Sequence, residues 1–152
     1  MTMKTLTQLM LVTLIICSAS CSDEVKSLKK IDGKWKITSL TFYGKNTADS
    51  TYTNDNFTLD FEKCNKKDNH SPGCRMTLQL NGKNYKYFYS IDGDRILLDF
   101  DSNDPATVDF ESKEGFLIMD RNVWDILTLN DSELSLRKNI NDEDFVEITA
   151  IK

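Results

Sequence analysis

Two stretches of alternating apolar and polar residues, joined by an Asn-Gly pair, limit what this chain can fold into. In residues 74–80, and again in residues 85–91, every second side chain is apolar. A period of two places one face of a β-strand in the core and the other face in water. The Asn81-Gly82 pair between the two runs favours the type I′ turn that joins antiparallel strands. The sequence therefore predicts a β-hairpin over Cys74–Ile91.

The same alternation continues along most of the chain after Gly33. Further runs cover residues 57–62, 96–100, 115–119, 123–129, 134–137 and 145–151, with turns at Asp92-Gly93 and Asn130-Asp131. In the first run the apolar positions change parity between Ile37 and Leu40, which predicts a β-bulge or bend there. Residues 21–152 show no helical period. Such short strands indicate a sandwich or a barrel, and hairpin connections favour an all-β, antiparallel up-and-down barrel of eight to ten strands.

The first twenty residues have the order of a secretory signal peptide. Lys4 precedes an apolar run over residues 9–16, and small residues follow at positions 18–20. The alternative, a membrane-spanning helix, needs about 20 apolar residues, roughly twice the length of this run. We therefore expect a signal peptide over residues 1–20, a polar, lysine-rich tether over residues 21–30 and one domain over residues 31–152.

The segment Ser18-Ala19-Ser20-Cys21 resembles the lipobox of bacterial lipoproteins, although Ser18 stands where a bulky aliphatic residue is usual. The resemblance implies that the signal is cut before Cys21 and that this cysteine is lipidated, since several acyl chains give stable anchoring. The alternative is a soluble secreted protein. The acidic start Ser22-Asp23-Glu24 resembles the surface-export signal of Bacteroidota lipoproteins. We expect an outer-membrane lipoprotein, on either the periplasmic face or the cell surface.

The net negative charge of the chain limits which kinds of molecule it can bind. The chain has 19 Lys and Arg against 24 Asp and Glu, and the loss of Lys4 with the signal leaves 18 against 24, a net charge of −6. An acidic domain without a basic block argues against a nucleic-acid partner and against electrostatic binding to anionic lipid.

Two of the four cysteines belong to the signal region and two to the predicted domain. Cys17 is expected to leave with the signal and Cys21 to carry lipid, so Cys64 and Cys74 remain. Outside the cytosol such a pair is expected to form a disulfide. The alternative is a metal site that adds His70, but three ligands at this spacing lack the fourth ligand of a structural zinc site. The sequence predicts a disulfide and no metal or other cofactor.

The Gly33-Lys34-Trp35 segment, at the head of the first predicted strand, resembles the G-x-W signature of lipocalins. With the lipobox, the tether and the meander of strands, the layout resembles that of lipocalin-like lipoproteins of Bacteroidota. The resemblance implies that Trp35 plugs one end of the barrel and that an arginine of a late strand, here Arg137, covers its ring through a cation–π contact. The Thr-Asp pair of the second lipocalin motif is absent, and Asp120-Arg121 stands in a comparable place.

Motifs of catalysis are missing. His70 is the only histidine and lies in the polar segment between the two remaining cysteines, whereas a histidine-activated nucleophile needs an imidazole held in a cleft. No G-x-S-x-G, H-E-x-x-H or phosphate loop occurs. Asp99, Asp101 and Asn103 resemble the start of a calcium loop, but Asp104 replaces its required glycine. We expect a protein that is not an enzyme.

Two functions remain open. An eight-stranded barrel can just hold one small ligand, and aromatic side chains suit an apolar one. The candidate ligand-binding residues are Phe57, Tyr85, Tyr87, Tyr89, Phe100 and Trp124. The alternative is a filled barrel that acts as a structural or protein-interaction lipoprotein, with Tyr43–Asn56 and Cys64–Cys74 as contact loops. The expected partners are the membrane, through the anchor, and either a small hydrophobic molecule or another envelope protein.

Overall fold

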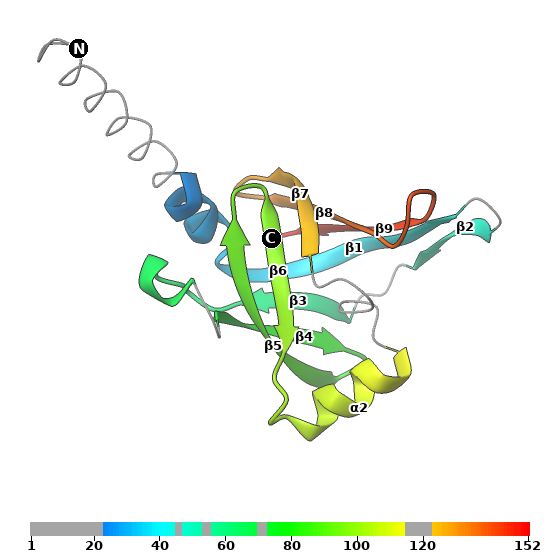
Figure 1. The fold of residues 1–152 in the computed structure, drawn as a ribbon, viewed down its shortest axis with the longest axis horizontal. Coiled ribbons are helices and arrows are strands. Elements are labelled where there is room, and N and C mark those ends of the chain that lie inside the picture. Colours follow the sequence, from blue (N-terminus) through cyan, green and yellow to red (C-terminus); the bar gives the residue numbers. More distant parts are fainter. Residues whose placement is uncertain (1–22, 45–46, 53–55, 70–72, 115–122) are drawn as a thin grey trace, which may run out of the picture.

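The structure, a computed structural model, describes residues 23–44, 47–52, 56–69, 73–114 and 123–152. The strands of this described part form one antiparallel sheet that curls on itself (Figure 1). Their bounds are β1 Gly33–Gly44, β2 Thr47–Tyr52, β3 Phe57–Phe61, β4 Cys74–Leu80, β5 Lys83–Asp92, β6 Arg95–Phe100, β7 Val123–Leu129, β8 Glu133–Asn139 and β9 Phe145–Ile151.

Pairing between β1 and β9 closes eight strands, β1 and β3–β9, into a barrel. The remaining strand, β2, pairs with the C-terminal part of β1, where Leu40 is opposite Tyr52. Strand β3 pairs with the N-terminal part of β1, where Lys36 is opposite Thr58. From β3 to β9 each strand is hydrogen-bonded to the next along the chain. The predicted up-and-down barrel is confirmed. The expectation of a loop over Tyr43–Asn56 is wrong for residues 43–44, which end β1, and for residues 47–52, which form β2.

Local sequence features account for the strand register. Asn81 and Gly82 have φ values of 52° and 77°, the positive values that a type I′ turn requires at both central residues. The predicted hairpin is thus present as β4 and β5. In β1, Ile37 is opposite Ala150 and Ser39 is opposite Thr149, so one extra residue is inserted between them. This irregularity confirms the predicted bulge.

Two helices were not predicted from the sequence. Residues 23–31 are helical, in the segment expected to be a tether, and we call them the N-terminal helix. Helix α2 covers Pro105–Glu114. The Asp104 carbonyl oxygen accepts hydrogen bonds from the amides of Thr107 and Val108, at 3.0 and 3.1 Å. Pro105 suits the first helical position, where no amide donor is needed. Of residues 105–113, the part of α2 whose burial is described, only Thr107 and Phe110 are buried, so the segment has no long apolar stripe.

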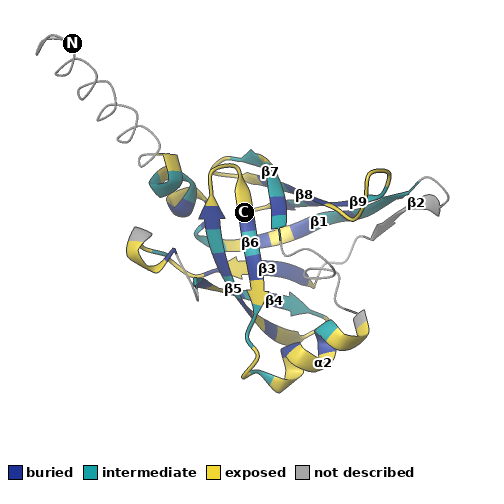
Figure 2. Ribbon diagram, in the orientation of Figure 1, coloured by how far each residue is buried: buried dark blue, intermediate teal, exposed yellow. Residues whose placement is uncertain are grey.

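Buried residues alternate with more exposed ones along the strands, as the burial colours of Figure 2 show. On β5 the buried residues are Tyr85, Tyr87, Tyr89 and Ile91. The two helices cover opposite ends of the barrel (Figure 1). We call the end at the N-terminal helix the base and the end at α2 the mouth. Seven-residue strands such as β4 span about 23 Å between the two ends, at ~3.3 Å per residue.

Some sequence-based predictions lie outside the described residues. They concern the signal peptide and Cys21, His70, the predicted strand Gly115–Met119 and the Asp120-Arg121 pair.

Candidate functional site

Trp35 lies at the base with none of its side chain exposed. Its indole Nε1 donates a 2.6 Å hydrogen bond to the carbonyl oxygen of Ile31, at the end of the N-terminal helix. The ammonium of Lys152 lies over the indole ring, 4.5 Å from its centroid. Trp35 therefore joins the barrel wall to the helix that covers the base.

The prediction that Arg137 covers Trp35 is wrong. On β8 the buried positions are Leu134, Leu136 and Lys138, so the alternation points Arg137 to the outside of the barrel. There its guanidinium lies 4.5 Å from the centroid of the Phe145 ring, and its Nε donates a 2.8 Å hydrogen bond to Glu147.

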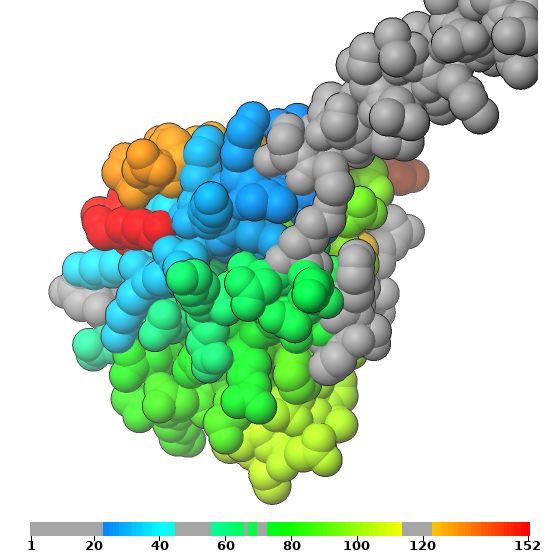
Figure 3. Space-filling view, turned by 90° about the vertical axis from the view of Figure 1, so that its left-hand side faces the viewer, coloured from blue at the N-terminus to red at the C-terminus, as the bar shows by residue number. Residues whose placement is uncertain are grey.

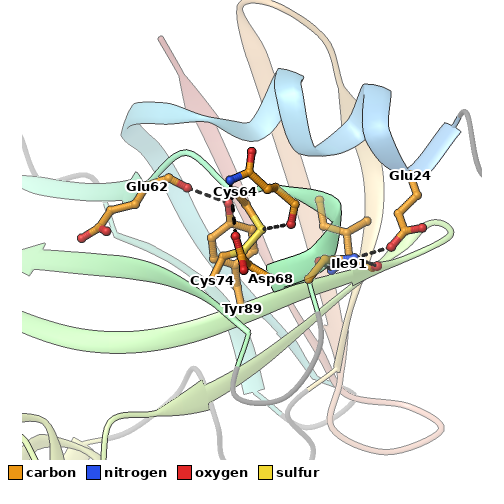
Figure 4. The surroundings of a disulfide bond; sticks show 9 residues. Glu24, Glu62, Cys64, Asp68, Cys74, Tyr89 and Ile91 are labelled. Carbon is orange, nitrogen blue, oxygen red and sulfur yellow. Dashed lines mark hydrogen bonds between the residues drawn. A yellow bond between two sulfur atoms is a disulfide. The ribbon is translucent and has the colours of Figure 1, made fainter.

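The base is further held by a disulfide between Cys64 and Cys74, whose Cα atoms are 5.6 Å apart. This confirms the predicted pairing. The closed loop contains the short helix η1, Lys66–Asp68. Asn69, at 2% exposure, accepts a hydrogen bond from the Ile91 amide and donates one to the Ile91 carbonyl, both at 2.7 Å. It also donates to the Glu24 carboxylate at 2.5 Å, which ties the loop to the N-terminal helix (Figure 4).

Five of the six predicted ligand-binding residues are buried inside the barrel, and the sixth packs against them. Phe57, Tyr85, Tyr87, Tyr89 and Trp124 are at most 7% exposed, whereas Phe100 is half-buried. They come from the four strands β3, β5, β6 and β7. Their inward direction agrees with the alternation of the sequence, while their part in ligand binding stays a prediction.

Helix α2 is attached to the mouth through contacts with β5. The Phe110 ring stacks on Tyr85, with centroids 4.1 Å apart. The Tyr87 hydroxyl donates a hydrogen bond to the Glu111 carboxylate. The amide of Lys86 donates to the Thr107 hydroxyl at 2.7 Å. These contacts place one face of α2 across the strand ends and bury Phe110 and Thr107.

An open groove of about 530 Å³ lies between α2 and the turn that joins β4 to β5. It is lined by Leu80, Asn81, Lys83, Tyr85, Ala106, Asp109, Phe110 and Lys113. The stacked pair Tyr85 and Phe110 is part of this lining, together with Leu80. Charged side chains also line it, and Lys113 forms a 2.7 Å ion pair with Asp109. The volume lies in the range of small-molecule sites, whereas the lining is about equally polar and apolar, and so more polar than that of most such sites.

Burial changes the acid–base chemistry of two barrel tyrosines. It raises the pKa of Tyr87 far above its ordinary value, and the neighbouring Glu111 carboxylate raises it further. Burial likewise raises the pKa of Tyr89, with smaller contributions from Asp32 and Glu62. Both phenols therefore remain protonated at physiological pH and act as hydrogen-bond donors, Tyr89 to the carbonyl oxygen of Glu62 at 2.9 Å.

Sequence analysis overlooked Lys138, which is only 1% exposed inside the barrel. Its ammonium lies 5.9 Å from the centroid of the Trp124 ring. A buried cation is unusual because desolvation disfavours charge in an apolar surrounding. The signal was present in the sequence, since Leu134, Leu136 and Lys138 share one parity on the same strand.

A second groove lies on the outer wall of the barrel. It has a volume of about 610 Å³ and lies along β5 and β6, where Phe88 and Leu97 face outward beside the residues 101–103 turn. No cluster of three or more potential metal ligands occurs among the described residues. None of the helices in the described part of the chain has the length and hydrophobicity of a membrane span.

Comparison with solved structures places the barrel among known folds. The chain matches the crystal structure of a lipocalin-like protein from Bacteroides uniformis ATCC 8492 with a TM-score of 0.54. The match covers 81% of this chain and 98% of the other, at 14% sequence identity. The fold is lipocalin-like. At this identity the likeness concerns the fold alone. No protein-family model matches the chain, and no curated protein matches it.

Proposed function

We propose that this chain is a lipid-anchored protein of the bacterial envelope whose lipocalin-like barrel binds a small apolar molecule at its mouth. The observation that carries the binding role is the 530 Å³ groove with the stacked Tyr85 and Phe110 rings in its lining. Lining residues are contributed by the β4–β5 turn and by α2, so the barrel positions the groove. This role is one of binding and involves no catalysis.

The binding site proposed here differs from the one expected from sequence. Inward-facing aromatic residues occupy the barrel between the two helices, and Phe110 of α2 stacks over Tyr85. Tyr85 is the one sequence-predicted ligand residue that also lines the groove. A ligand therefore contacts the barrel at the groove first, and Tyr85 is the residue that links the groove to the interior.

Membrane attachment is proposed from the sequence. The lipobox-like segment that ends at Cys21 supports acylation of that cysteine, and the lipocalin-like fold supports a binding domain behind it. The proposed location is the outer membrane, on its periplasmic face or on the cell surface. Acylation is tested by the mass of the N-terminal peptide of the mature protein, with Cys21→Ser as the control.

The binding role is tested with the soluble Cys21→Ser form and a fluorescent fatty-acid probe that responds to its environment. We expect saturable binding, weakened at least about tenfold by Tyr85→Ala, since each 1.4 kcal/mol of lost contact is one decade in affinity. Ala106→Trp changes an exposed lining residue and is expected to block the groove without removing a core contact. Phe88→Ala, on the outer groove, is the matched control and is expected to bind normally.

A second candidate function is a protein-interaction module. The observation that favours it is the outer groove, where Phe88 and Leu97 leave apolar surface on the barrel wall. Absence of probe binding by a folded Cys21→Ser protein would favour this function over the first. Loss of binding to an envelope partner on Phe88→Ala, with Ala106→Trp unaffected, would support it directly.

A further inference from the structure

The N-terminal helix is not a free tether. Leu28 and Ile31, on one of its faces, are 2% and 0% exposed. Ile31 accepts the hydrogen bond of the Trp35 indole, and the Lys30 carbonyl accepts a 2.7 Å hydrogen bond from the Lys152 ammonium. The last turn of the helix is thus attached to both β1 and the end of β9.

The first turn of this helix is attached as well. Glu24 accepts the hydrogen bond of Asn69, which is itself bound to both backbone groups of Ile91. Asn69 belongs to the loop that the Cys64–Cys74 disulfide closes. In Figure 3 the helix, in blue, and this loop, in green, lie side by side on one face of the molecule. The helix is therefore fixed to the base at both of its ends.

The number of residues between Cys21 and the N-terminal helix limits how far the base can lie from a membrane. Cys21 precedes Asp23, the first described residue of the N-terminal helix, by two positions. Two residues span at most about 7 Å even when fully extended. A lipid on Cys21 therefore holds the start of the N-terminal helix, which is fixed to the base, within about 7 Å of the lipidated cysteine. The mouth lies at the other end of the barrel, roughly 20 Å away along the strands.

We infer that the base is a membrane-facing surface, and that the mouth, with α2 and the groove, points away from the membrane that carries the anchor. The inference rests on the proposed acylation of Cys21. Its partner is a bilayer surface, selected by the anchor position and not by charge. Exposed Lys29, Lys30, Lys63 and Lys67 lie at the base, but Asp32, Glu62 and Asp68 lie there too, so the charge is mixed.

This orientation determines how a ligand reaches the groove. A mouth that faces away from the anchoring bilayer exchanges its ligand with the aqueous space or with a partner there. Direct lateral transfer from the anchoring leaflet is excluded, because the groove and that leaflet lie at opposite ends of the barrel. The disulfide and Asn69 keep this orientation fixed by holding the helix to the base.

The orientation is tested on the acylated full chain in vesicles of phosphatidylcholine and phosphatidylglycerol that carry a headgroup quencher. With Cys17 removed, Cys21 acylated and Cys64 and Cys74 paired, one added cysteine is the only free thiol for a fluorophore. Lys29→Cys labels the base and Ser112→Cys labels α2, and both positions are exposed. Lys67→Cys and Asp142→Cys form a second pair, at the base and at the β8–β9 turn.

We expect the headgroup quencher to act at least about twofold more strongly on the base labels, because contact quenching does not reach across the ~20 Å to the mouth. Iodide in the aqueous phase is expected to give the reverse order. A long Gly-Ser insertion between Ser22 and Asp23 is expected to abolish the difference, since it frees the domain from the anchor.

The results of these experiments distinguish the orientation of the domain from the proposed acylation of Cys21 and from the proposed ligand binding. Equal or reversed quenching in a chain whose Cys21 is shown by mass to be acylated would overturn the orientation and leave the anchor intact. An unmodified Cys21 would overturn both the anchor and the orientation. Neither result bears on the groove, which is tested by probe titration of the soluble form.

Discussion

The ammonium of Lys152 lies over the ring of Trp35, with 4.5 Å between the nitrogen and the ring centroid. The same ammonium donates a hydrogen bond to the Lys30 carbonyl oxygen. A side chain that follows β9 therefore joins the signature tryptophan of β1 to the N-terminal helix. In this chain a lysine supplies the cation that the lipocalin resemblance assigned to Arg137.

The first prediction concerns this cation–π contact. Because Lys152 is exposed, the contact is worth about 0.5–1 kcal/mol, and Lys152→Met is expected to lower the free energy of unfolding by about this amount in urea denaturation of the Cys21→Ser form. Lys34→Met is the matched control, since Lys34 is also exposed and donates only to the Gln79 side chain. Equal losses in the two variants would contradict a special contact with Trp35.

The second prediction concerns the disulfide at the base. Cys64 and Cys74 are separated by ten positions, and closing a loop of this length constrains the unfolded chain by about 2–3 kcal/mol. The double variant Cys64→Ser, Cys74→Ser is expected to lose this free energy of unfolding in denaturant titrations. Reduction of the parent protein is expected to produce the same loss. A parent protein that unfolds at the same denaturant concentration with and without reductant would argue against the bond.

The third prediction concerns the pH dependence of stability through Tyr87. Burial and Glu111 raise the pKa of Tyr87 in the folded protein above its ordinary value of 10.0. The stability that depends on this protonated phenol is therefore fully present below pH 10 and is lost as the pH rises above it. Tyr87→Phe is expected to reduce the fall of stability above pH 10, by about 1.4 kcal/mol per pH unit for one proton.

Neutral pH gives the control for this prediction. There Tyr87→Phe is expected to cost about 1–3 kcal/mol, because the hydrogen bond to a carboxylate is lost. Denaturant titrations at pH 7 and at several values above pH 10 measure both effects. Identical pH profiles for the parent and the variant would show that another group controls alkaline unfolding.

The barrel could be predicted because its strands alternate visibly. The Asn81-Gly82 turn and the change of parity between Ile37 and Leu40 are local signals, and the structure has a type I′ turn and a bulge there. The disulfide followed from counting cysteines, and the placement of Tyr85 followed from its parity. Each of these features depends on residues close together in the sequence.

The helices and the groove could not be predicted because they depend on distant contacts. In α2 the buried residues are Thr107 and Phe110, with Glu111 in contact with Tyr87 beside them, and in the N-terminal helix only Leu28 and Ile31 are buried. Two buried residues give too little periodicity to indicate a helix. The groove exists because α2 returns to the β4–β5 turn, and no local pattern determines that return.

For Arg137, the family resemblance gave a wrong placement, whereas the alternation of buried and exposed residues along β8 gave the right one. The lipocalin resemblance favoured an arginine on a late strand, whereas alternation within the same strand places Arg137 on the face opposite Leu134 and Leu136. The structure agrees with the alternation, since Arg137 pairs with Glu147 outside the barrel. On this strand, parity was the better guide, and it also identifies the buried Lys138.

The last prediction concerns Gly73, which precedes the disulfide cysteine of β4. Its φ is +90°, and a Cβ there would lie 2.5 Å from the carbonyl oxygen of Tyr89. Gly93 also has a positive φ, +60°, but a Cβ there would have no atom within 4 Å. Gly93→Ala is therefore expected to cost only the backbone strain of about 1–2 kcal/mol.

Gly73→Ala is expected to cost more than Gly93→Ala, because strain and a steric clash with β5 add. Relief of such a clash requires backbone shifts that cost about another 1–3 kcal/mol. Denaturant titrations of the two alanine variants measure the difference directly. Because Gly73 lies beside the disulfide, oxidation is confirmed first by the absence of free thiol. Equal stability of the two oxidised variants would mean that β4 and β5 can separate at this point without cost, contrary to the close approach of their backbones.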